Sequence, residues 1–386
     1  MSASRWGEVG QESCTAHSKA ASKTGITVNS VGVYQWKAML DGLKPNTQYC
    51  YRVYLGSGGT VDLLATDASP RFWSQLPAGS AQPFSFAVFG DWGYTGNGPN
   101  PDQANLMAQI AKSGARFAFS TGDTAYPTGS QTNYGDLVQT GTNISTVFGP
   151  QFWTVAGSSI PLFSPLGNHG LSSTFLVNWP QSRAASTSGG KYQMETYCCL
   201  NGTTSKSYPS AWYAFDAGIA RFYVLDAAWS NSNVGTADIY KNDFDYHWAP
   251  TSAEFQWLES DLASHPSALK FAIFHFPLYS DNATEKSDLF LRGAESLEGL
   301  LNQYGVDLAF NGHAHIYQRN LKPHAESVIS YLTGGGGGKL APIGPCSPWD
   351  AYGRGWSNSQ NKGYKCGAGV PVPTSKSQVH HSFSCP

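Results

Sequence analysis

Short apolar runs recur along the chain, and each is followed by a glycine or a polar residue. Five of them cover residues 84–89, 117–121, 160–166, 269–274 and 306–310. Continuous apolar runs of this length, bounded by turn residues, are typical of buried strands. Apolar residues at helical spacing predict helices over 103–114, 252–264 and 295–304, the second of them capped by Ser252. Strands that alternate with helices indicate an α/β fold.

Residues 1–80 follow another pattern, with short alternating strands and no helical period. Within them, residues 43–53 resemble the tyrosine corner and following strand of fibronectin type III domains, in which a Tyr hydroxyl bonds to the backbone upstream. A complete domain of this kind needs about seven strands over about a hundred residues. The strands expected before Trp6 are missing, so we expect a truncated sandwich with an exposed edge.

Several other stretches carry local signals. Residues 76–83 are small and rich in turn residues, which is typical of a linker. Residues 211–216 and 221–226 predict two paired strands. Residues 127–159 are rich in Gly, Ser and Thr, and we expect a loop-rich wall there. The glycine run at 334–338 favours a flexible turn over a phosphate-binding loop, because no Lys-Ser/Thr pair follows it.

The residues that follow the five apolar runs are of the kinds that bind metal ions. In order they are Asp91, Asp123, Tyr126, Asn168, His169, His275, His313 and His315. In an open α/β sheet, ligands gather at the carboxyl ends of the strands, and glycine lets the backbone approach an ion closely. One such block is usually only a turn after a strand, but five in succession predict a metal site. Oxygen and imidazole ligands without thiolate suit iron, zinc or manganese.

The same blocks carry a family resemblance. In order, GDWG, GDTAY, GNHG, FHFP and GHAH resemble the signature of the calcineurin-like metallophosphoesterases, and the tyrosine of the second block is similar to that of the purple acid phosphatases. The resemblance implies a four-layer αββα sandwich. We therefore expect a partial fibronectin type III-like domain at 1–80, a metallophosphoesterase catalytic domain at 84–345 and a loop-rich tail at 346–386.

The resemblance also implies which residues hold which ion. It implies a ferric ion on Asp91, Asp123, Tyr126 and His315. It implies a divalent iron, zinc or manganese ion on Asp123, Asn168, His275 and His313, so that Asp123 bridges the two. It also implies that Asn168 and His169 contact the substrate phosphate, with His169 in a position to bind it or to donate a proton.

The chemistry of these residue types agrees with that assignment. A phenolate such as Tyr126 is a hard anionic donor and favours ferric iron. A bridging carboxylate such as Asp123 can hold two ions about 3.5–4 Å apart, and such ions lower the pKa of bound water to give a hydroxide nucleophile. A serine or cysteine nucleophile is then unnecessary.

The sequence departs from the family pattern in two places. Gly170 stands where the third block usually has an acidic residue that steadies the loop of His169. Residues 281–286 lack the histidine pair of plant-type relatives, so leaving-group protonation falls to His169, to Glu285 or to water. A general acid is worth roughly 10²–10⁴ in rate. Asp226 also ends a strand, but no family ligand matches it, and we expect a structural role.

Composition and charge narrow the range of partners. The 386 residues are 41% hydrophobic and only 13% charged, with a net charge of −2. This balance argues against a nucleic-acid partner, which would require a basic surface. No apolar run approaches the length of about eighteen residues that a membrane span needs, and no signal peptide is visible.

Seven cysteines bear on the compartment. None lies in a metal block. Cys14–Cys50 and Cys346–Cys366 are plausible disulfides, and the other three cysteines stay unassigned. Because disulfides persist in oxidising compartments, we expect a secreted or extracytoplasmic protein.

The sequence therefore predicts a binuclear metallohydrolase that cleaves small phosphate monoesters, best at acid pH, as an acid phosphatase does. One alternative is a phosphodiesterase or nucleotide hydrolase with the same site. The other is a non-catalytic binding or cell-surface protein that keeps the fold. The sequence leaves the physiological ester, the divalent ion and the oligomeric state open.

Overall fold

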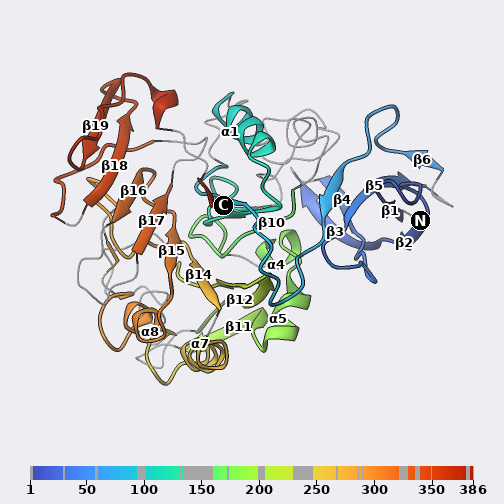
Figure 1. Cartoon of the computed structure of the whole chain (residues 1–386), viewed down its shortest axis with the longest axis horizontal. Helices are drawn as coiled ribbons and strands as arrows, with labels where there is room; N and C mark the ends of the chain where they lie inside the picture. The colour runs from blue at the N-terminus through green and yellow to red at the C-terminus, as the bar shows by residue number, and fades with distance from the viewer. Residues whose placement is uncertain are drawn as a thin grey trace.

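A computed structural model of the chain describes residues 3–28, 31–56, 60–93, 101–130, 133, 160–171, 174–198, 205–228, 247–266, 268–285, 287–288, 290–320, 329–334, 340–348, 350–379 and 383–385. Their strands form sheets of five, four and nine strands and a two-stranded ribbon. Figure 1 shows the five-stranded sheet and the ribbon, in blue, beside a larger body that contains the other two sheets. Most of the predicted wall at 127–159 and of the glycine run at 334–338 lies outside the described residues.

The smaller sheet of the larger body has the strand order β10-β9-β8-β20. Three parallel strands form most of it, namely β8 (Phe86–Phe89), β9 (Phe117–Ser120) and β10 (Leu162–Phe163). β20 (Phe383–Cys385) runs antiparallel beside β8. Successive side chains of a strand point to opposite faces, so Phe86 and Val88 face the larger sheet while Ala87 and Phe89 face a helix.

The larger sheet has the strand order β11-β12-β13-β14-β15-β17-β16-β18-β19. Its centre is parallel and contains β13 (Ala220–Val224), β14 (Leu269–Ile273), β15 (Leu308–Asn311) and β17 (Ile329–Thr333). Antiparallel strands flank this centre, namely β11 (Lys191–Cys198), β12 (Ser205–Ala217), β16 (Tyr317–Asn320), β18 (Asp350–Ser357) and β19 (Lys362–Cys366). Each of the five predicted apolar runs contributes a strand, and the predicted pairing of 211–216 with 221–226 is confirmed.

A buried aromatic core lies between the two sheets. Phe86 of β8 packs against Phe222 of β13 and Phe271 of β14, with ring centroids 5.0 and 5.4 Å away. Phe117 of β9 lies 5.3 Å from Phe222. Full burial of one such side chain contributes about 1.5–3 kcal/mol to stability. This core fixes the two sheets to each other, and thereby fixes the loops at their strand ends.

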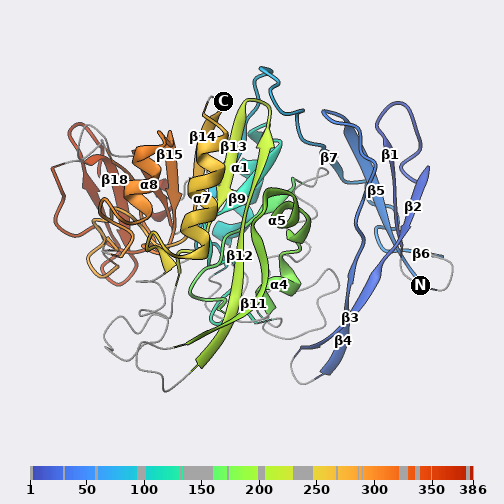
Figure 2. The same ribbon diagram turned by 90° about the horizontal axis from the view of Figure 1, so that it is seen from below.

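Helices cover the outer faces of both sheets. α1 (Pro101–Lys112) packs Leu106 and Ile110 against the smaller sheet. α7 (Ala253–Ser264) and α8 (Leu297–Gln303) pack against the larger sheet. Figure 1 shows α1 on the opposite side of the sheets from α7 and α8, and Figure 2 shows α7 along β13 and β14. The observed order is helix, sheet, sheet, helix, and the predicted α/β class is confirmed.

The helix predicted at 252–264 follows from its local sequence. The hydroxyl of Ser252 accepts a hydrogen bond from the Phe255 amide at 3.3 Å, which is an N-cap contact. Phe255, Leu258 and Leu262 are buried as predicted. Two short helices that the sequence pattern does not predict, α4 (Thr174–Asn178) and α5 (Ser182–Ser188), lie beside β12.

The C-terminal residues form strands where we expected a loop-rich tail at 346–386. β18 and β19 extend the larger sheet, and β20 adds an edge strand to the smaller one. Glycine and polar residues interrupt the apolar alternation of β18, and β20 has only three residues. Such strands form because a distant strand pairs with them, so their own pattern does not predict them.

Residues 3–73 form separate β-structure. Its sheet contains β1 (Ala3–Glu8), β2 (His17–Ala20), β5 (Gln48–Leu55), β6 (Val61–Asp62) and β7 (Arg71–Trp73), and β3 (Ser22–Val28) pairs with β4 (Val31–Lys37) as the ribbon. The Tyr49 hydroxyl accepts a hydrogen bond from the Lys44 amide at 2.8 Å, which is the upstream contact of a tyrosine corner. The fibronectin type III assignment of this region stays a prediction.

Two disulfides join the cysteine pairs proposed from the sequence, Cys14–Cys50 and Cys346–Cys366. The second ties β19 to the turn that precedes β18. Within the described part of the chain, none of the helices is both long and apolar enough to cross a bilayer.

Candidate metal centre

Loops from both sheets carry the predicted site residues to one place. Asp91 follows β8, Asp123 and Tyr126 follow β9, and Asn168 and His169 follow β10. His275 follows β14, and His313 and His315 follow β15. The structure brings the side chains of seven of them together in two overlapping clusters, and His169 lies beside these clusters.

The first cluster surrounds the hydroxyl of Tyr126. This oxygen lies 3.1 Å from Asp91 Oδ1 and 2.9 Å from Asp123 Oδ2. It also lies 3.1 Å from Nε2 of His315. These are the four residues that the resemblance assigns to the ferric ion.

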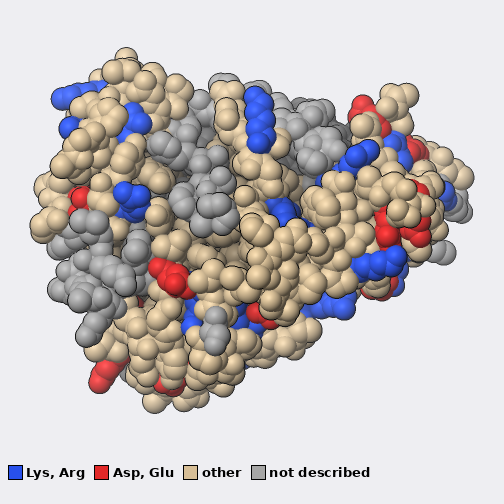
Figure 3. Space-filling view, viewed as in Figure 1, with Lys and Arg blue, Asp and Glu red and all other residues tan. Residues whose placement is uncertain are grey.

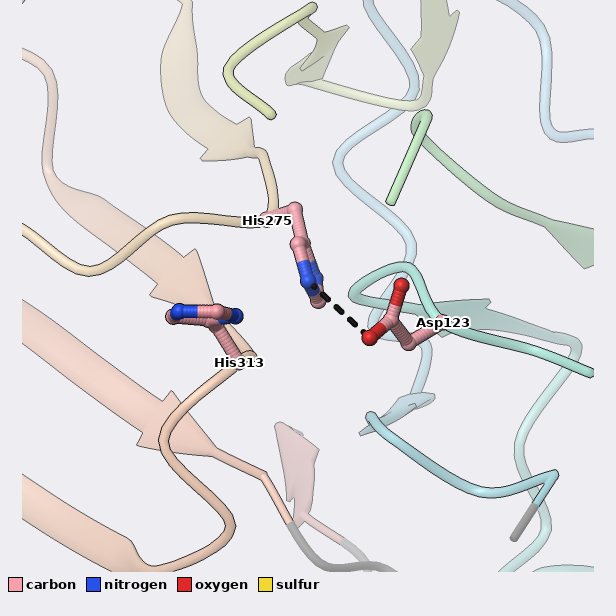
Figure 4. Close-up of side chains that lie close together, drawn as sticks. All are labelled: Asp123, His275 and His313. Carbon is pink, nitrogen blue, oxygen red and sulfur yellow. Dashed lines mark ion pairs between the residues drawn. The ribbon is translucent and has the colours of Figure 1, made fainter. Parts of the chain in front are cut away.

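The second cluster surrounds the side-chain oxygen of Asn168. This atom lies 2.8 Å from His275 Nε2 and 3.0 Å from His313 Nδ1. His275 Nε2 is in turn 3.4 Å from Asp123 Oδ2, the contact drawn in Figure 4 between strand ends of the two sheets. Ligand atoms of Asp123, His275 and His313 all lie within 4.8 Å of one another. Asp123 Oδ2 takes part in both clusters, as a bridging ligand would.

Backbone groups hold these side chains in orientation. Oδ2 of Asp91 accepts a hydrogen bond from the His313 amide at 2.8 Å, and Oδ1 of Asp123 accepts one from the His169 amide at 2.8 Å. Nδ1 of His275 lies 2.8 Å from the carbonyl of Thr121 and therefore carries a proton. In each residue one atom is thus fixed, and the other ligand atom faces the centre of the site.

The contacts of the Tyr126 hydroxyl fit a site built for cations. A hydroxyl has one proton to donate, yet this oxygen contacts carboxylate oxygens of both Asp91 and Asp123. Both carboxylates are almost fully buried, at 0% and 3% exposure. Two buried carboxylates beside one phenol need positive charge, and the oxygen and imidazole donors around them suit iron, zinc or manganese.

The pKa values of these side chains reflect the same need for positive charge. Burial raises the pKa of Asp91 to about 7, although the charge of His275 opposes the change. Burial by itself lowers the pKa of His275, but the carboxylates of Asp123 and Asp91 outweigh it and raise that pKa to about 9. Burial, with the same two carboxylates, raises the pKa of Tyr126 well above its usual range. Bound cations would reverse this order by favouring the deprotonated ligands.

The backbone is strained at the ligands. Asp91, Asp123, His313 and His315 all have left-handed conformations, with φ of 52°, 48°, 67° and 46°. Residues with side chains seldom adopt this region, and clusters of them mark functional sites. Gly122 shows a related need, because its φ is 98° and a Cβ there would lie 2.6 Å from His275 Nδ1.

His169 lies on the wall of a cavity of about 230 Å³ beside the clusters. Its Nδ1 is 2.5 Å from the carbonyl of Pro127, and its ring centroid is 4.4 Å from that of Tyr126. The Pro127 carbonyl therefore orients the His169 ring. This contact is present although Gly170 replaces the acidic residue that the family pattern usually has in this loop. Sequence inspection could not find this contact, because any residue at 127 supplies a carbonyl.

Asp226 lies away from these clusters, in line with the structural role we expected. It is buried at 2% exposure, and its Oδ2 accepts a hydrogen bond from the Ala211 amide at 2.8 Å. Burial and the neighbouring Glu254 raise the pKa of Asp226 well above its usual range.

Residues 84–317 match the family model of the calcineurin-like phosphoesterases. This match covers more than half of the chain, and the protein belongs to that family. The resemblance to purple acid phosphatases seen in the sequence is confirmed as well. Purple acid phosphatase 23 of Arabidopsis thaliana is 23% identical over 361 residues, which cover 85% of this chain and 68% of the relative.

Other similar proteins include an acid phosphatase, a relative named as inactive and a solved structure. Acid phosphatase A of Cryphonectria parasitica is 23% identical over 400 residues, which cover 86% of this chain and 75% of that protein. An Arabidopsis thaliana relative named as a probable inactive purple acid phosphatase, number 27, is 27% identical and covered over 51% of its length. A solved purple acid phosphatase from yellow lupin (Lupinus luteus) seeds aligns with 99% of this chain and 69% of its own, at a TM-score of 0.62 and 17% identity, which shows a common fold.

Proposed function

We propose that this protein is an acid phosphatase that hydrolyses phosphate monoesters at a two-metal centre. The observation that carries the proposal is the pair of donor clusters that share Asp123 Oδ2. Asp91, Asp123, Tyr126 and His315 would hold ferric iron. Asp123, Asn168, His275 and His313 would hold divalent iron, zinc or manganese. When bound, the two cations supply electrophilic activation of the phosphate and of water.

The chain's own residues then bind and orient the ester. His169 donates its Nδ1 proton to the Pro127 carbonyl, so its Nε2 is the nitrogen left to contact the phosphate or the leaving oxygen. Asn168 stands next to it and belongs to both the metal and the substrate contacts. His169 thereby becomes the catalytic residue of the proposal, and its ring is held in place before substrate arrives.

The compartment and partners follow from the same features. Two disulfides support a secreted or extracytoplasmic protein, because such bonds persist where thiols are oxidised. Among the described residues on the face drawn in Figure 3, Lys and Arg are scattered and form no single basic band. This supports a small phosphate ester as the partner. We also propose that the tyrosine-corner region at 1–80 is a partial fibronectin type III-like domain that precedes the catalytic domain at 84–345.

The test is metal content and turnover measured on the same sample. We expect two ions per chain and an aryl phosphate monoester rate above that of a bis-aryl diester. A faster diester reaction would favour the phosphodiesterase. A protein that binds no metal even after reconstitution would favour the non-catalytic binding protein, an outcome that relatives named as inactive make worth measuring.

Asp123→Asn is the sharpest variant for this test. We expect loss of both ions and a fall in turnover of about 10³-fold or more, because several kcal/mol of electrophilic stabilisation disappear. Asp226→Asn is the matched control, since Asp226 is also a buried aspartate after a strand and its raised pKa favours the uncharged form that asparagine imitates. The control should keep its metals and activity. Full activity in Asp123→Asn would refute the bridging role.

A further inference from the structure

We propose that Glu285 is the positioning residue of His313, holding that ring so that Nδ1 binds the second metal ion. The inference rests on the proposed metal centre and adds a residue that the family resemblance does not supply. The two nitrogens of His313 face different partners. Nδ1 lies 3.0 Å from Asn168 Oδ1 in the second cluster, and Nε2 lies 3.2 Å from Glu285 Oε2.

Two other site histidines show the same arrangement with a weaker partner. Nδ1 of His275 faces the carbonyl of Thr121, and Nδ1 of His169 faces the carbonyl of Pro127. In each case an oxygen acceptor holds the nitrogen that points away from the centre. For His313 the acceptor is a charged carboxylate, which makes a stronger hydrogen bond and a more basic imidazole. We therefore expect the second ion to be bound more tightly than it would be if a backbone carbonyl oriented His313.

The loop that carries Glu285 is built to hold it. The side-chain oxygen of Asn282 accepts hydrogen bonds from the amides of Thr284 at 2.7 Å and Glu285 at 3.1 Å. The Ser280 hydroxyl donates to the Glu285 carbonyl at 2.7 Å. The backbone of Glu285 is thus fixed on both sides, which a solvated loop residue would not require.

Asn282 also ties this loop to the histidines. Its side-chain amide donates to the carbonyl of Ala314, the residue between His313 and His315. Residues 282–284 form an Asn-Ala-Thr triplet, which is the pattern of an N-glycosylation acceptor. Because Asn282 is only 2% exposed, we attribute it to packing and not to an accessible glycosylation site. Motion of Glu285 relative to His313 is limited because one buried side chain contacts both loops.

The cost of keeping a carboxylate here is small. The Glu285 side chain is 31% exposed while that of His313 is 7% exposed, so the charge keeps contact with water and its hydrogen bond reaches into the site. Glu285 also lines the 230 Å³ cavity beside His169, so it could act on substrate instead, and the experiment must separate the two roles.

The experiment uses protein loaded with ferric iron and zinc and equilibrated against increasing concentrations of a chelator. Zinc retained per chain is measured for the wild type and for Glu285→Gln and Glu285→Ala. We expect zinc binding about tenfold weaker in Glu285→Gln, which keeps the acceptor oxygen but loses the charge, and up to about 100-fold weaker in Glu285→Ala. Iron content should stay unchanged. Excess zinc should restore turnover with an unchanged KM.

Glu295→Gln is the matched control, because Glu295 is an exposed glutamate ten positions along the chain. It should bind zinc as the wild type does, and melting curves check that every variant is folded. Unchanged zinc retention in both Glu285 variants would overturn the inference alone. A KM that changes in either direction, or turnover that stays low with zinc bound, would place Glu285 on the substrate and also overturn the inference. A wild type that binds no metal would overturn the inference together with the proposed function.

Discussion

At the scale of single residues, the metal centre combines strained backbone with fixed side chains. The left-handed conformations of Asp91, Asp123, His313 and His315 cost on the order of 1 kcal/mol or more each. Asp and His tolerate this region better than branched residues do. The strain persists because backbone amides from other loops hold the Asp91 and Asp123 carboxylates. Contacts within the protein therefore fix one carboxylate oxygen of each of these two residues.

Tyr126→Phe tests the ion assignment at this scale. The phenol is the one ligand type in the site that gives ferric iron a visible absorption band, so the iron-loaded variant should lose that band. Ferric affinity should fall as well, because a hard anionic donor is removed. Tyr213→Phe is the control, since Tyr213 is also buried but lies in the core between the sheets. A variant that keeps the wild-type band would contradict the role of Tyr126.

At the scale of elements, the site depends on strands whose ends are fixed by packing on both faces. β14 leads directly to His275, and α7 covers the outer face of the sheet that contains β14. Ala272 and Phe274 pack in the cluster that contains Leu258. The helix therefore supports the proposed ligand His275 through the sheet.

Leu258→Ala tests this support. Leu258 is fully buried in α7, so its truncation should lower the free energy of unfolding by about 2–5 kcal/mol. The measurement is the urea midpoint of metal-loaded protein. Gln256→Ala, on the exposed side of the same helix, is the control and should change stability by less than about 0.5 kcal/mol. Equal effects of the two changes would mean that Leu258 does not pack between α7 and the larger sheet.

At the scale of the whole molecule, a pair of carboxyl groups joins the C-terminal strand β18 to the loop that carries Glu285. Asp281 belongs to the loop that carries Glu285, and Asp350 begins β18. Oδ2 of each accepts a hydrogen bond from the Ser347 amide at 2.9 Å, and Gln318 donates to Asp350 at 2.7 Å. Burial, together with the hydrogen bond and charge of Asp281, raises the pKa of Asp350 to about 7.

The raised pKa of Asp350 predicts that the folded protein is more stable in mild acid than at neutral pH. The folded protein holds the Asp350 proton up to about pH 7, whereas the unfolded chain releases it near pH 4. Stability from this group is complete below pH 4 and is lost as the pH rises towards 7 and above. The expected loss between pH 5 and pH 8 is on the order of 1 kcal/mol, because solvent screens a half-buried carboxylate.

Asp350→Asn measures that contribution. Asparagine stays neutral at every pH, so urea midpoints of the variant at pH 5 and pH 8 should differ less than those of the wild type. Both proteins are compared with the same metals bound, so that titration within the metal centre cancels. Identical pH dependence of the two proteins would exclude Asp350 as a source of acid stability.

The sequence alone determined the class of fold and predicted residues that the structure brings close together. Apolar runs followed by residues of metal-binding types are local signals. They can be recognised in the sequence without knowing where the strand lies in its sheet. The cap of α7 and its buried face are equally local, since Ser252 acts within one turn. Tyr126 lies three residues after Asp123 in the same loop, so their closeness in space follows from the sequence.

Tertiary structure decided what holds those residues in place. The partners of His313, Asp91 and Asp123 lie in loops far away along the chain, so no pattern in the sequence names them. β18 and β20 became strands through pairing with β16 and β8, and not through their own alternation. Periodicity is a property of neighbouring residues, whereas orientation and edge pairing depend on contacts that exist only after the sheets have packed.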